Sequence, residues 1–438
     1  MKLCTLIFAL IFLIAAPHTN AQNLRPGKIR KLIEKSEILN KHFTGFMLYD
    51  LSTRKTIAEQ LSHKYFTPAS NTKLFTFYSG LKILKDSVAG LQYVIKGDSL
   101  IFWSTADPTF LHPDFAGQKV KDFLLASGKK LYWAKGRYKG EFYGTGWSYD
   151  DYNEYYQPEI SELPVFGNIL RIKANGNILL SSPPLPLTGI FTIMQDSLNS
   201  GEKFRVRREI SNNTFHFPAR DPGTSYSQEI PFKTDEKTID TLLKVVFPNY
   251  QGTTTMEKPE LTQTIYSSLS DSVFKHMLLP SDNFMAEQLL LNYSAAAGLT
   301  MSTDSVIKYM LQNHLTDLPD KPQWVDGSGL SRQNLFSPAD LVKLCEKIYD
   351  EVGDEKRVFA LLPNGGKSGT LKKAFKADIA FIFAKTGSLS NNYNLTGYLK
   401  TEAGKTLIFS FMNNNFLSPI ADLKAEVERI LTLIHTRY

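Results

Sequence analysis

A serine and a lysine stand three positions apart in the stretch TPASNTKLFT, residues 67–76. Positions i and i+3 of a helix share one face, so Ser70 Oγ and Lys73 Nζ could meet over a first turn. A serine hydroxyl is a weak nucleophile until a neighbouring base takes its proton. The pair is therefore a candidate nucleophile and base. In the structural alternative, Ser70 caps a helix and Lys73 is solvated.

The S-x-x-K spacing is weak evidence by itself, because it recurs elsewhere, for example at Ser52 and Lys55. Two later motifs distinguish Ser70 from these other serines. The sequence S-D-N follows at 281–283, and K-T-G, which occurs once in the chain, follows at 385–387. These three motifs in this order form the signature shared by penicillin-binding proteins and serine β-lactamases.

Longer stretches narrow the resemblance within that group. They include FTPASNTKLFT, GDSLIFWSTADPTF, LPSDNFMAEQLL, DGSGLSRQNLFSPADL and AKTGSLSNNYNLTGYLKT. Over nearly the whole chain after its N-terminal segment, the sequence resembles the D-alanyl-D-alanine carboxypeptidase/endopeptidase family, the DacB-like low-molecular-mass class C penicillin-binding proteins. The long separation between Ser70 and Ser281 agrees with this family, since class A β-lactamases place the two motifs much closer together.

The resemblance implies a catalytic role for each residue of the first two motifs. Ser70 would attack the substrate carbonyl, and Lys73 would accept the Ser70 proton. Ser281 would relay a proton to the leaving amine, while Asn283 would bond the substrate amide and orient Lys73. Lys73 can act as a base only if its pKa falls below 10.4, which burial and the nearby Lys385 cation would bring about.

The third motif would form the strand at the edge of the cleft. An extended peptide could pair with this edge, and Gly387 would leave room for its close approach. Thr386, Ser388 and the charge of Lys385 would hold the terminal carboxylate of D-alanine. Backbone N–H groups of Ser70 and Ser388 would form the oxyanion hole.

Hydrophobic periodicity predicts the elements that must position these residues. Helices are expected over 26–42, from residue 70 onwards, across 272–297 and over 418–437, and strands within 44–62, 378–387, 392–401 and 405–414. We predict an α/β (α+β) fold, whose transpeptidase-like core is an antiparallel sheet flanked by helices. The core is split between 22–88 and 258–438, and residues 89–257 form a β-rich insertion that could hold two nested lobes.

An aromatic run at 131–156 lies in that insertion. Core and hairpin packing is the favoured explanation, because aromatic residues are common in strands. A platform for a sugar or peptide substrate is the alternative.

The N-terminus and the composition limit the remaining possibilities. Residues 1–21 are typical of a secretory signal peptide cleaved after about Ala21, and no later stretch is long and apolar enough to span a membrane. The formal net charge of +7 is spread without basic blocks, so no nucleic-acid partner is expected. Scattered histidines predict no metal site, and no cofactor motif is present. Cys345 lies in an apolar helical pattern and is expected to be a buried thiol.

These observations predict an exported, periplasmic serine D,D-peptidase. It would act on peptidoglycan stem peptides as a carboxypeptidase, an endopeptidase or both, and it would bind β-lactams. The alternatives are a β-lactamase or esterase on the same scaffold, and a non-catalytic wall-binding or β-lactam-sensing module. The sequence leaves open the balance of the two activities, the third residue of the stem peptide, the oligomeric state, and the roles of Asp326 and of residues 368–371.

Overall fold

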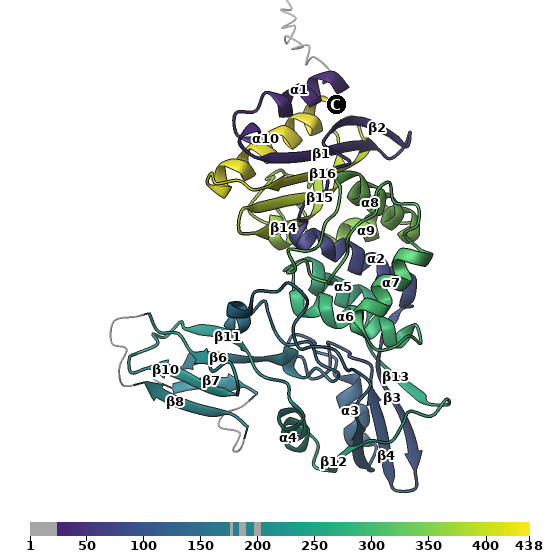
Figure 1. Cartoon of the computed structure of the whole chain (residues 1–438), viewed down its shortest axis with the longest axis vertical. Helices are drawn as coiled ribbons and strands as arrows, with labels where there is room; N and C mark the ends of the chain where they lie inside the picture. Colours follow the sequence, from purple (N-terminus) through teal and green to yellow (C-terminus); the bar gives the residue numbers. More distant parts are fainter. Residues whose placement is uncertain (1–23, 176–177, 184–189, 197–202) are drawn as a thin grey trace, which may run out of the picture.

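The computed structural model describes residues 24–175, 178–183, 190–196 and 203–438. The predicted signal peptide lies outside these ranges. Figure 1 shows an elongated molecule with three parts. One sheet with α1 and α10 forms one end, the helices α2 and α5 to α9 form the middle, and further strands form the other end.

The sheet at the first end has five strands in the order β14–β15–β16–β1–β2, and every neighbouring pair is antiparallel. Its strands are β1 (Phe43–Asp50), β2 (Lys55–Gln60), β14 (Ile382–Leu389), β15 (Asn392–Lys400) and β16 (Thr406–Asn414). Short turns join β14 to β15 and β15 to β16. Because β14 is the first strand in the order, the K-T-G sequence lies on an edge strand of the sheet.

Helices cover both faces of this sheet. Side chains alternate across a strand, so Phe409 and Phe411 of β16 pack toward α1 (Pro26–Glu34) and α10 (Ile420–Arg437). Ile408 and Met412 pack toward the helices on the other face. Those helices are α2 (Lys73–Ile83), α5 (Ser270–Leu278), α6 (Asn283–Ala296), α7 (Thr303–Asn313), α8 (Pro338–Val352) and α9 (Glu355–Leu361). The predicted antiparallel sheet flanked by helices is confirmed.

A second five-stranded sheet has the order β12–β5–β4–β3–β13. It runs from β3 (Ser87–Lys96) and β4 (Ser99–Ser104), through β5 (Lys130–Ala134) and β12 (Tyr250–Thr254), to β13 (Gln263–Leu269). This sheet therefore extends past both predicted limits of the insertion, 89 and 257. Two α-helices accompany these strands, α3 (Lys119–Ala126) and α4 (Glu236–Val246).

Two three-stranded sheets complete the described strands, in the orders β11–β6–β7 and β8–β10–β9. Their strands are β6 (Ile169–Asn175), β7 (Ile178–Ser182), β8 (Thr192–Asp196), β9 (Arg207–Arg208), β10 (Thr214–Pro218) and β11 (Ser227–Pro231). Figure 1 shows them grouped away from β3, β4 and β12. The division of the insertion into nested lobes stays a prediction.

Two predicted helices differ from the structure. The helix expected over 26–42 ends at Glu34, and a 3₁₀ turn, Leu39–Lys41, follows it. The helix expected across 272–297 is two helices, α5 and α6. Pro280 and Ser281, which has a φ of 66°, interrupt it, because proline lacks an N–H and a positive φ is not helical.

The aromatic run at 131–156 does not form the predicted hairpin. After β5, its residues form only a 3₁₀ turn, Tyr149–Asn153, and irregular chain.

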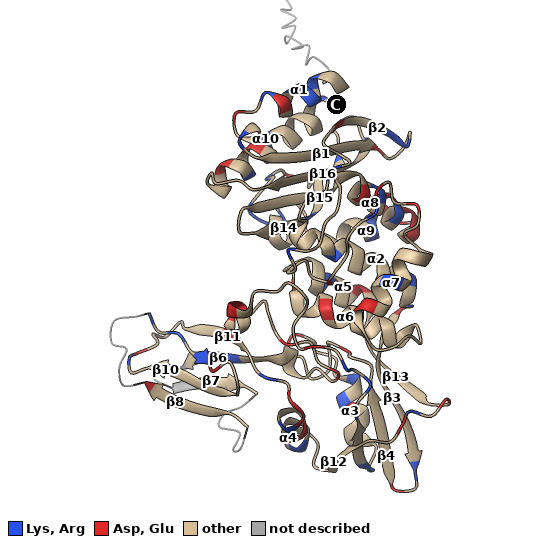
Figure 2. Ribbon diagram, viewed as in Figure 1, with Lys and Arg blue, Asp and Glu red and all other residues tan. Residues whose placement is uncertain are grey.

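The expected buried thiol is present, since Cys345 on α8 is fully buried and burial raises its pKa. Figure 2 shows acidic and basic residues interspersed along the ribbon. Among the described helices, none combines the length and apolar character that crossing a membrane requires.

Candidate active site

Ser70 and Lys73 lie at the junction of a 3₁₀ turn, Ala69–Thr72, and helix α2. Lys73 Nζ donates a hydrogen bond to Ser70 Oγ at 3.0 Å. The expectation that i and i+3 meet over a first turn is therefore correct. The capping alternative for Ser70 is wrong, because neither the 3₁₀ turn nor α2 has a side-chain cap and their N-cap residues are Pro68 and Thr72.

The Lys73 amine is enclosed by three oxygen atoms. Besides Ser70 Oγ, it donates to Asn283 Oδ1 at 2.6 Å and to the carbonyl oxygen of Ser328 at 2.8 Å. Lys73 is fully buried, and this burial lowers its pKa to about 8, although the negative charges of Glu287, Asp282 and Asp326 oppose the shift. A lysine with this pKa is neutral for a useful fraction of the time near neutral pH.

The S-D-N sequence forms the break between α5 and α6. Asp282 caps α6 by accepting a hydrogen bond from the N–H of Met285, which is a structural role. The cap fixes Asn283 as the first residue of α6. Its amide is oriented at both ends, since Oδ1 accepts from Lys73 and Nδ2 donates to the carbonyl oxygen of Tyr156 at 2.9 Å.

Lys385 lies on the edge strand β14 and closes the site from a third segment of the chain. Its Nζ donates to Ser281 Oγ and to the carbonyl oxygen of Thr386, both at 2.8 Å. Burial and then the charge of Lys73 hold the pKa of Lys385 well below its usual value. The sequence led us to expect that Lys385 would lower the pKa of Lys73. Burial is the largest cause of the lowered pKa at both lysines, and the charge repulsion between the two amines belongs to the pair.

Gly387 packs against the segment that carries Ser70. A Cβ atom at this position would lie 2.4 Å from the carbonyl oxygen of Pro68 and 3.0 Å from the backbone nitrogen of Asn71. The absent side chain makes room for the segment that carries Ser70. The expectation that Gly387 leaves room for the substrate stays a prediction.

Thr386 and Ser388 flank Gly387 on β14 and, two positions apart on a strand, share one face of it. Thr386 Oγ1 donates to Thr370 Oγ1 at 2.8 Å, so residues 368–371, which had no predicted role, lie beside β14. Ser388 is exposed and lines the same cleft as Ser70. The predicted oxyanion hole, formed by the backbone N–H groups of Ser70 and Ser388, requires that both residues line one cleft.

The cleft in front of these side chains has a volume of about 600 Å³. It is lined by Ser70, Gly146, Ser148, Asp151, Tyr155, Tyr156, Gln157, Pro280, Ser281, Asn283, Gly329, Leu330, Arg332, Ser388, Leu389 and Ser390. Tyr155 and Tyr156 belong to the aromatic run of the insertion, so for these two residues the structure favours the platform alternative over core packing.

Several residues of this site are absent from the sequence-based prediction. Glu287 lies four positions after Asn283 on α6 and is buried. An i+4 search along that helix could have found it. Asp326 was noted without a role; it accepts a hydrogen bond from Trp147 Nε1 at 2.9 Å. The carbonyl of Ser328 carries no sequence signal, because every residue has one.

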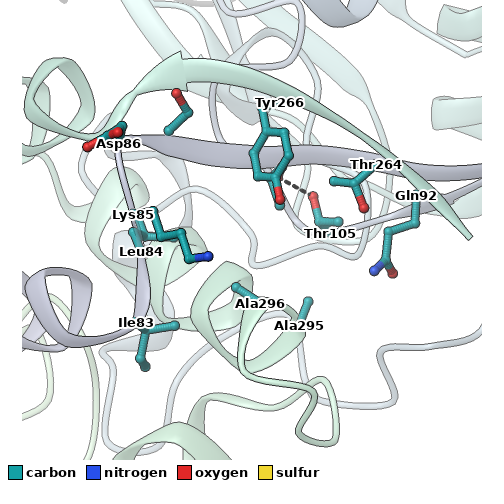
Figure 3. Close-up of a pocket in the computed structure, with 12 residues that line it drawn as sticks. Ile83, Leu84, Lys85, Asp86, Gln92, Thr105, Thr264, Tyr266, Ala295 and Ala296 are labelled. Atoms are coloured by element: carbon teal, nitrogen blue, oxygen red, sulfur yellow. Dashed lines mark hydrogen bonds between the residues drawn. The ribbon is translucent and has the colours of Figure 1, made fainter.

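A second cavity, of about 460 Å³, lies away from Ser70. Figure 3 shows its labelled lining: Tyr266, Thr264, Thr105 and Gln92 from the second sheet and its adjoining loop, and residues at the ends of α2 and α6. None of the residues predicted to act in catalysis lines it.

In the described ranges, no group of three or more His, Cys, Asp or Glu side chains is placed to hold a metal ion.

Comparison with protein families gives one match that covers most of the chain. The D-Ala-D-Ala carboxypeptidase 3 (S13) family matches residues 26–433. Among curated proteins, the chain is 32% identical over 184 residues to a penicillin-sensitive carboxypeptidase A from Dictyostelium discoideum, covering 39% of this chain and 35% of that protein. It is 27% identical over 184 residues to the D-alanyl-D-alanine carboxypeptidase DacB of Haemophilus influenzae, covering 40% of this chain and 38% of that protein. The aligned stretches thus span little more than a third of these relatives.

Solved structures show the same fold over nearly the whole chain. Penicillin-binding protein 4 (dacB) from Haemophilus influenzae superposes with a TM-score of 0.71 at 18% identity, covering 93% of this chain and 97% of that chain. A predatory peptidoglycan endopeptidase from Bdellovibrio bacteriovorus gives a TM-score of 0.51 at 12% identity, covering 90% and 93%.

Proposed function

The chain belongs to the D-Ala-D-Ala carboxypeptidase 3 (S13) family, and from that premise we propose that it is a serine D,D-peptidase acting on peptidoglycan stem peptides. One observation carries the proposal: Ser70 Oγ, Lys73 Nζ and Asn283 Oδ1 form a continuous hydrogen-bonded chain at the wall of a cleft. A buried amine with a lowered pKa beside a serine hydroxyl is the arrangement that general-base activation of a nucleophile needs.

The acylation step follows from this geometry. Neutral Lys73 takes the proton of Ser70 while Ser70 Oγ bonds to the carbonyl carbon of the penultimate D-alanine. The resulting oxyanion collapses and the C–N bond to the terminal residue breaks. Ser281, bonded to Lys385, passes its hydroxyl proton to the leaving amine, and the proton that Lys73 took from Ser70 is passed on to replace it, so that Lys73 is neutral again. Water then hydrolyses the ester, which regenerates Ser70 and releases the shortened peptide.

The edge strand β14 supports binding of an extended substrate. Edge strands leave backbone N–H and C=O groups unpaired, and a peptide can add to them. In this proposal Thr386, Ser388 and Lys385 receive the terminal carboxylate. The approach of that negative charge would favour the ammonium form of Lys385, whose pKa is lowered by burial.

The same proposal extends to the organisation of the chain. All five proposed catalytic residues lie in the ranges 22–88 and 258–438, which we assign to the peptidase core, except for the start of β3 and the whole of β13, which belong to the second sheet. The carbonyl of Tyr156 reaches the site from the insertion. We further propose that residues 1–21 direct export to the periplasm, where peptidoglycan is found.

The relatives and neighbours favour peptidase action over the two alternatives. Two curated relatives are named as carboxypeptidases, and one solved structure of this fold is named as a peptidoglycan endopeptidase. A β-lactamase on this scaffold would differ in fast hydrolysis of the penicilloyl ester. A binding module would have no need for the linked serine, two amines and carboxamide.

The test is release of D-alanine from a stem pentapeptide, and of monomers from D,D-crosslinked dimers. We expect wild type to cleave at least one of these substrates and Ser70→Ala to cleave neither. Ser305→Ala, which removes the serine of another S-x-x-K sequence, on α7, is the matched control and should retain wild-type rates. Equal cleavage by Ser70→Ala and wild type would refute the proposal, as would wild type that turns over penicillin rapidly and cleaves neither peptide.

A further inference from the structure

The Lys73 amine can act as a base only in one orientation. As an ammonium it has three N–H groups, and the structure provides three acceptors for them. When Lys73 is neutral, one N–H is replaced by a lone pair. That lone pair faces Ser70 Oγ only if the other two N–H groups stay on Asn283 Oδ1 and the Ser328 carbonyl. The position of the Ser328 carbonyl therefore decides whether Lys73 can accept the Ser70 proton.

Glu287 holds the two peptides that directly precede this carbonyl, 326–327 and 327–328. One carboxylate oxygen, Oε1, accepts from the N–H of Ser328 at 2.7 Å, and the other, Oε2, accepts from the N–H of Gly327 at 2.9 Å. Glu287 is buried on α6, one turn after Asn283. A single helix thus reaches Lys73 twice, directly through Asn283 and indirectly through Glu287.

The rest of the loop 326–331 is held just as closely. Asp326 is buried and accepts from the N–H groups of Gly329 at 2.8 Å and Ser331 at 2.6 Å. It also accepts from Asn334 Nδ2 at 2.7 Å and from Trp147 Nε1 at 2.9 Å. The loop cannot shift its Ser328 carbonyl without breaking some of these buried hydrogen bonds, each of which is costly to leave unmade.

The carbonyl of Gly327 is fixed from α2 itself. Thr76 Oγ1, on the turn after Lys73, donates to it at 2.7 Å. At Gly329 a Cβ atom would lie 1.9 Å from the carbonyl oxygen of Ala69, so this loop also abuts the turn that carries Ser70. The loop, the nucleophile and the base are therefore in one packed unit.

We propose that Glu287 is a positioning residue for acylation, which holds the Ser328 carbonyl where it directs the lone pair of Lys73 toward Ser70. The inference rests on the proposed function, because it assigns a part in the reaction of that same site. Glu287 does not touch the substrate in this account, and it acts only through the backbone N–H groups of Gly327 and Ser328.

Removal of the Glu287 charge distinguishes the positioning role from a purely electrostatic role, because the two roles predict different changes in rate. Burial and then the charge of Asp326 raise the pKa of Glu287, and the titratable groups that interact with it are Lys73, Asp326 and the phenol of Tyr138. A negative charge at Glu287 favours the ammonium form of Lys73, so removing it lowers the pKa of Lys73 or leaves it unchanged. Electrostatics alone would then make Glu287→Gln no slower than wild type.

The test is the rate of covalent labelling by a fluorescent penicillin as a function of pH. In Glu287→Gln one backbone N–H meets the amide NH₂ of the new side chain instead of an oxygen. We expect the rate on the alkaline plateau to fall about 10- to 100-fold, as small misplacements of reacting groups do, with the midpoint of the pH profile unchanged or lower. The final labelled fraction should stay that of wild type.

Glu346→Gln is the matched control, because Glu346 is another buried glutamate, bonded to Tyr49 and Arg54 and remote from Ser70 in its contacts. A plateau rate for Glu287→Gln within twofold of wild type overturns the inference, and so does an equal loss in Glu346→Gln. If Glu287→Gln does not fold, Glu287→Asp takes its place, and a plateau rate within twofold of wild type overturns the inference there too. Failure of wild type itself to label would instead refute the proposed function.

Discussion

The carbonyl oxygen of Pro68 lies 2.4 Å from the point that a Cβ atom on Gly387 would occupy. This relationship joins the edge strand β14 to the turn that carries Ser70, although 319 positions separate the two residues along the chain. The contact is between backbones, so no side-chain rotation could relieve it. The spacing between Ser70 and Lys385 therefore depends on the absence of a side chain at residue 387.

Gly387→Ala should separate β14 from residues 68–71. We expect a loss of stability of about 1–3 kcal/mol, typical of overpacking a buried site, and a fall of at least tenfold in penicillin labelling. Thermal unfolding and labelling rate measure the two effects. Gly27→Ala is the control, because nothing lies within 4 Å of its added Cβ atom. Wild-type labelling by Gly387→Ala would show that this contact does not position the site.

The pH dependence of acylation should follow Lys73. Its pKa is lowered to about 8 by burial, and only the neutral amine can take a proton. Acylation should therefore rise with pH, about tenfold per unit below the pKa, and level off above about pH 8. Labelling rates between pH 5.5 and 9.5 check this, with thermal unfolding to confirm that the protein stays folded. A rate that is flat or falls across this range would contradict Lys73 as the base.

Removal of the Lys73 amine should abolish most of the acylation rate. Lys73→Met keeps the length and apolar stem of the side chain but offers no base, so we expect a loss of about 10²–10⁴-fold, the usual contribution of general-base catalysis. Lys82→Met, on the same helix and paired with Glu351 at the surface, should label at the wild-type rate. A Lys73→Met rate within threefold of wild type would assign the base elsewhere.

The hydrogen bond from Asn71 to Thr396 should contribute measurably to stability. Asn71 Nδ2 donates to Thr396 Oγ1 at 2.7 Å, and both residues are buried. Thr396→Val preserves shape but leaves the amide without its acceptor, which should cost about 1–3 kcal/mol. Urea unfolding measures this, with Thr436→Val at an exposed position as the comparison. An unchanged midpoint would indicate that water or a rotated amide replaces the lost acceptor.

The residues that lie together at the site could be predicted from the sequence because they belong to three short motifs. Ser70 and Lys73 meet through a local i to i+3 relation, which sequence spacing expresses directly. The C-terminal strands and the closing helix were also predictable, since alternating and helical apolar patterns mark β15, β16 and α10. These are local properties of consecutive residues.

Contacts between distant segments of the chain could not be predicted from the sequence. The roles of Glu287 and Asp326 depend on a loop that approaches Lys73 from a distant segment, and the backbone oxygen of Ser328 has no residue type to identify it. Gly387 was noted, but the neighbour that requires a glycine there, Pro68, is visible only in three dimensions. The left-handed backbone of Ser281, which divides the predicted helix, is likewise a property of the fold.

The most direct measurement of the central claim is intact-protein and peptide mass spectrometry after incubation with benzylpenicillin. The account predicts one penicilloyl group per molecule, carried by the peptide that contains Ser70. It also predicts no adduct on Ser70→Ala. An adduct on another residue, or an adduct of equal yield on Ser70→Ala, would contradict the assignment of Ser70 as the nucleophile.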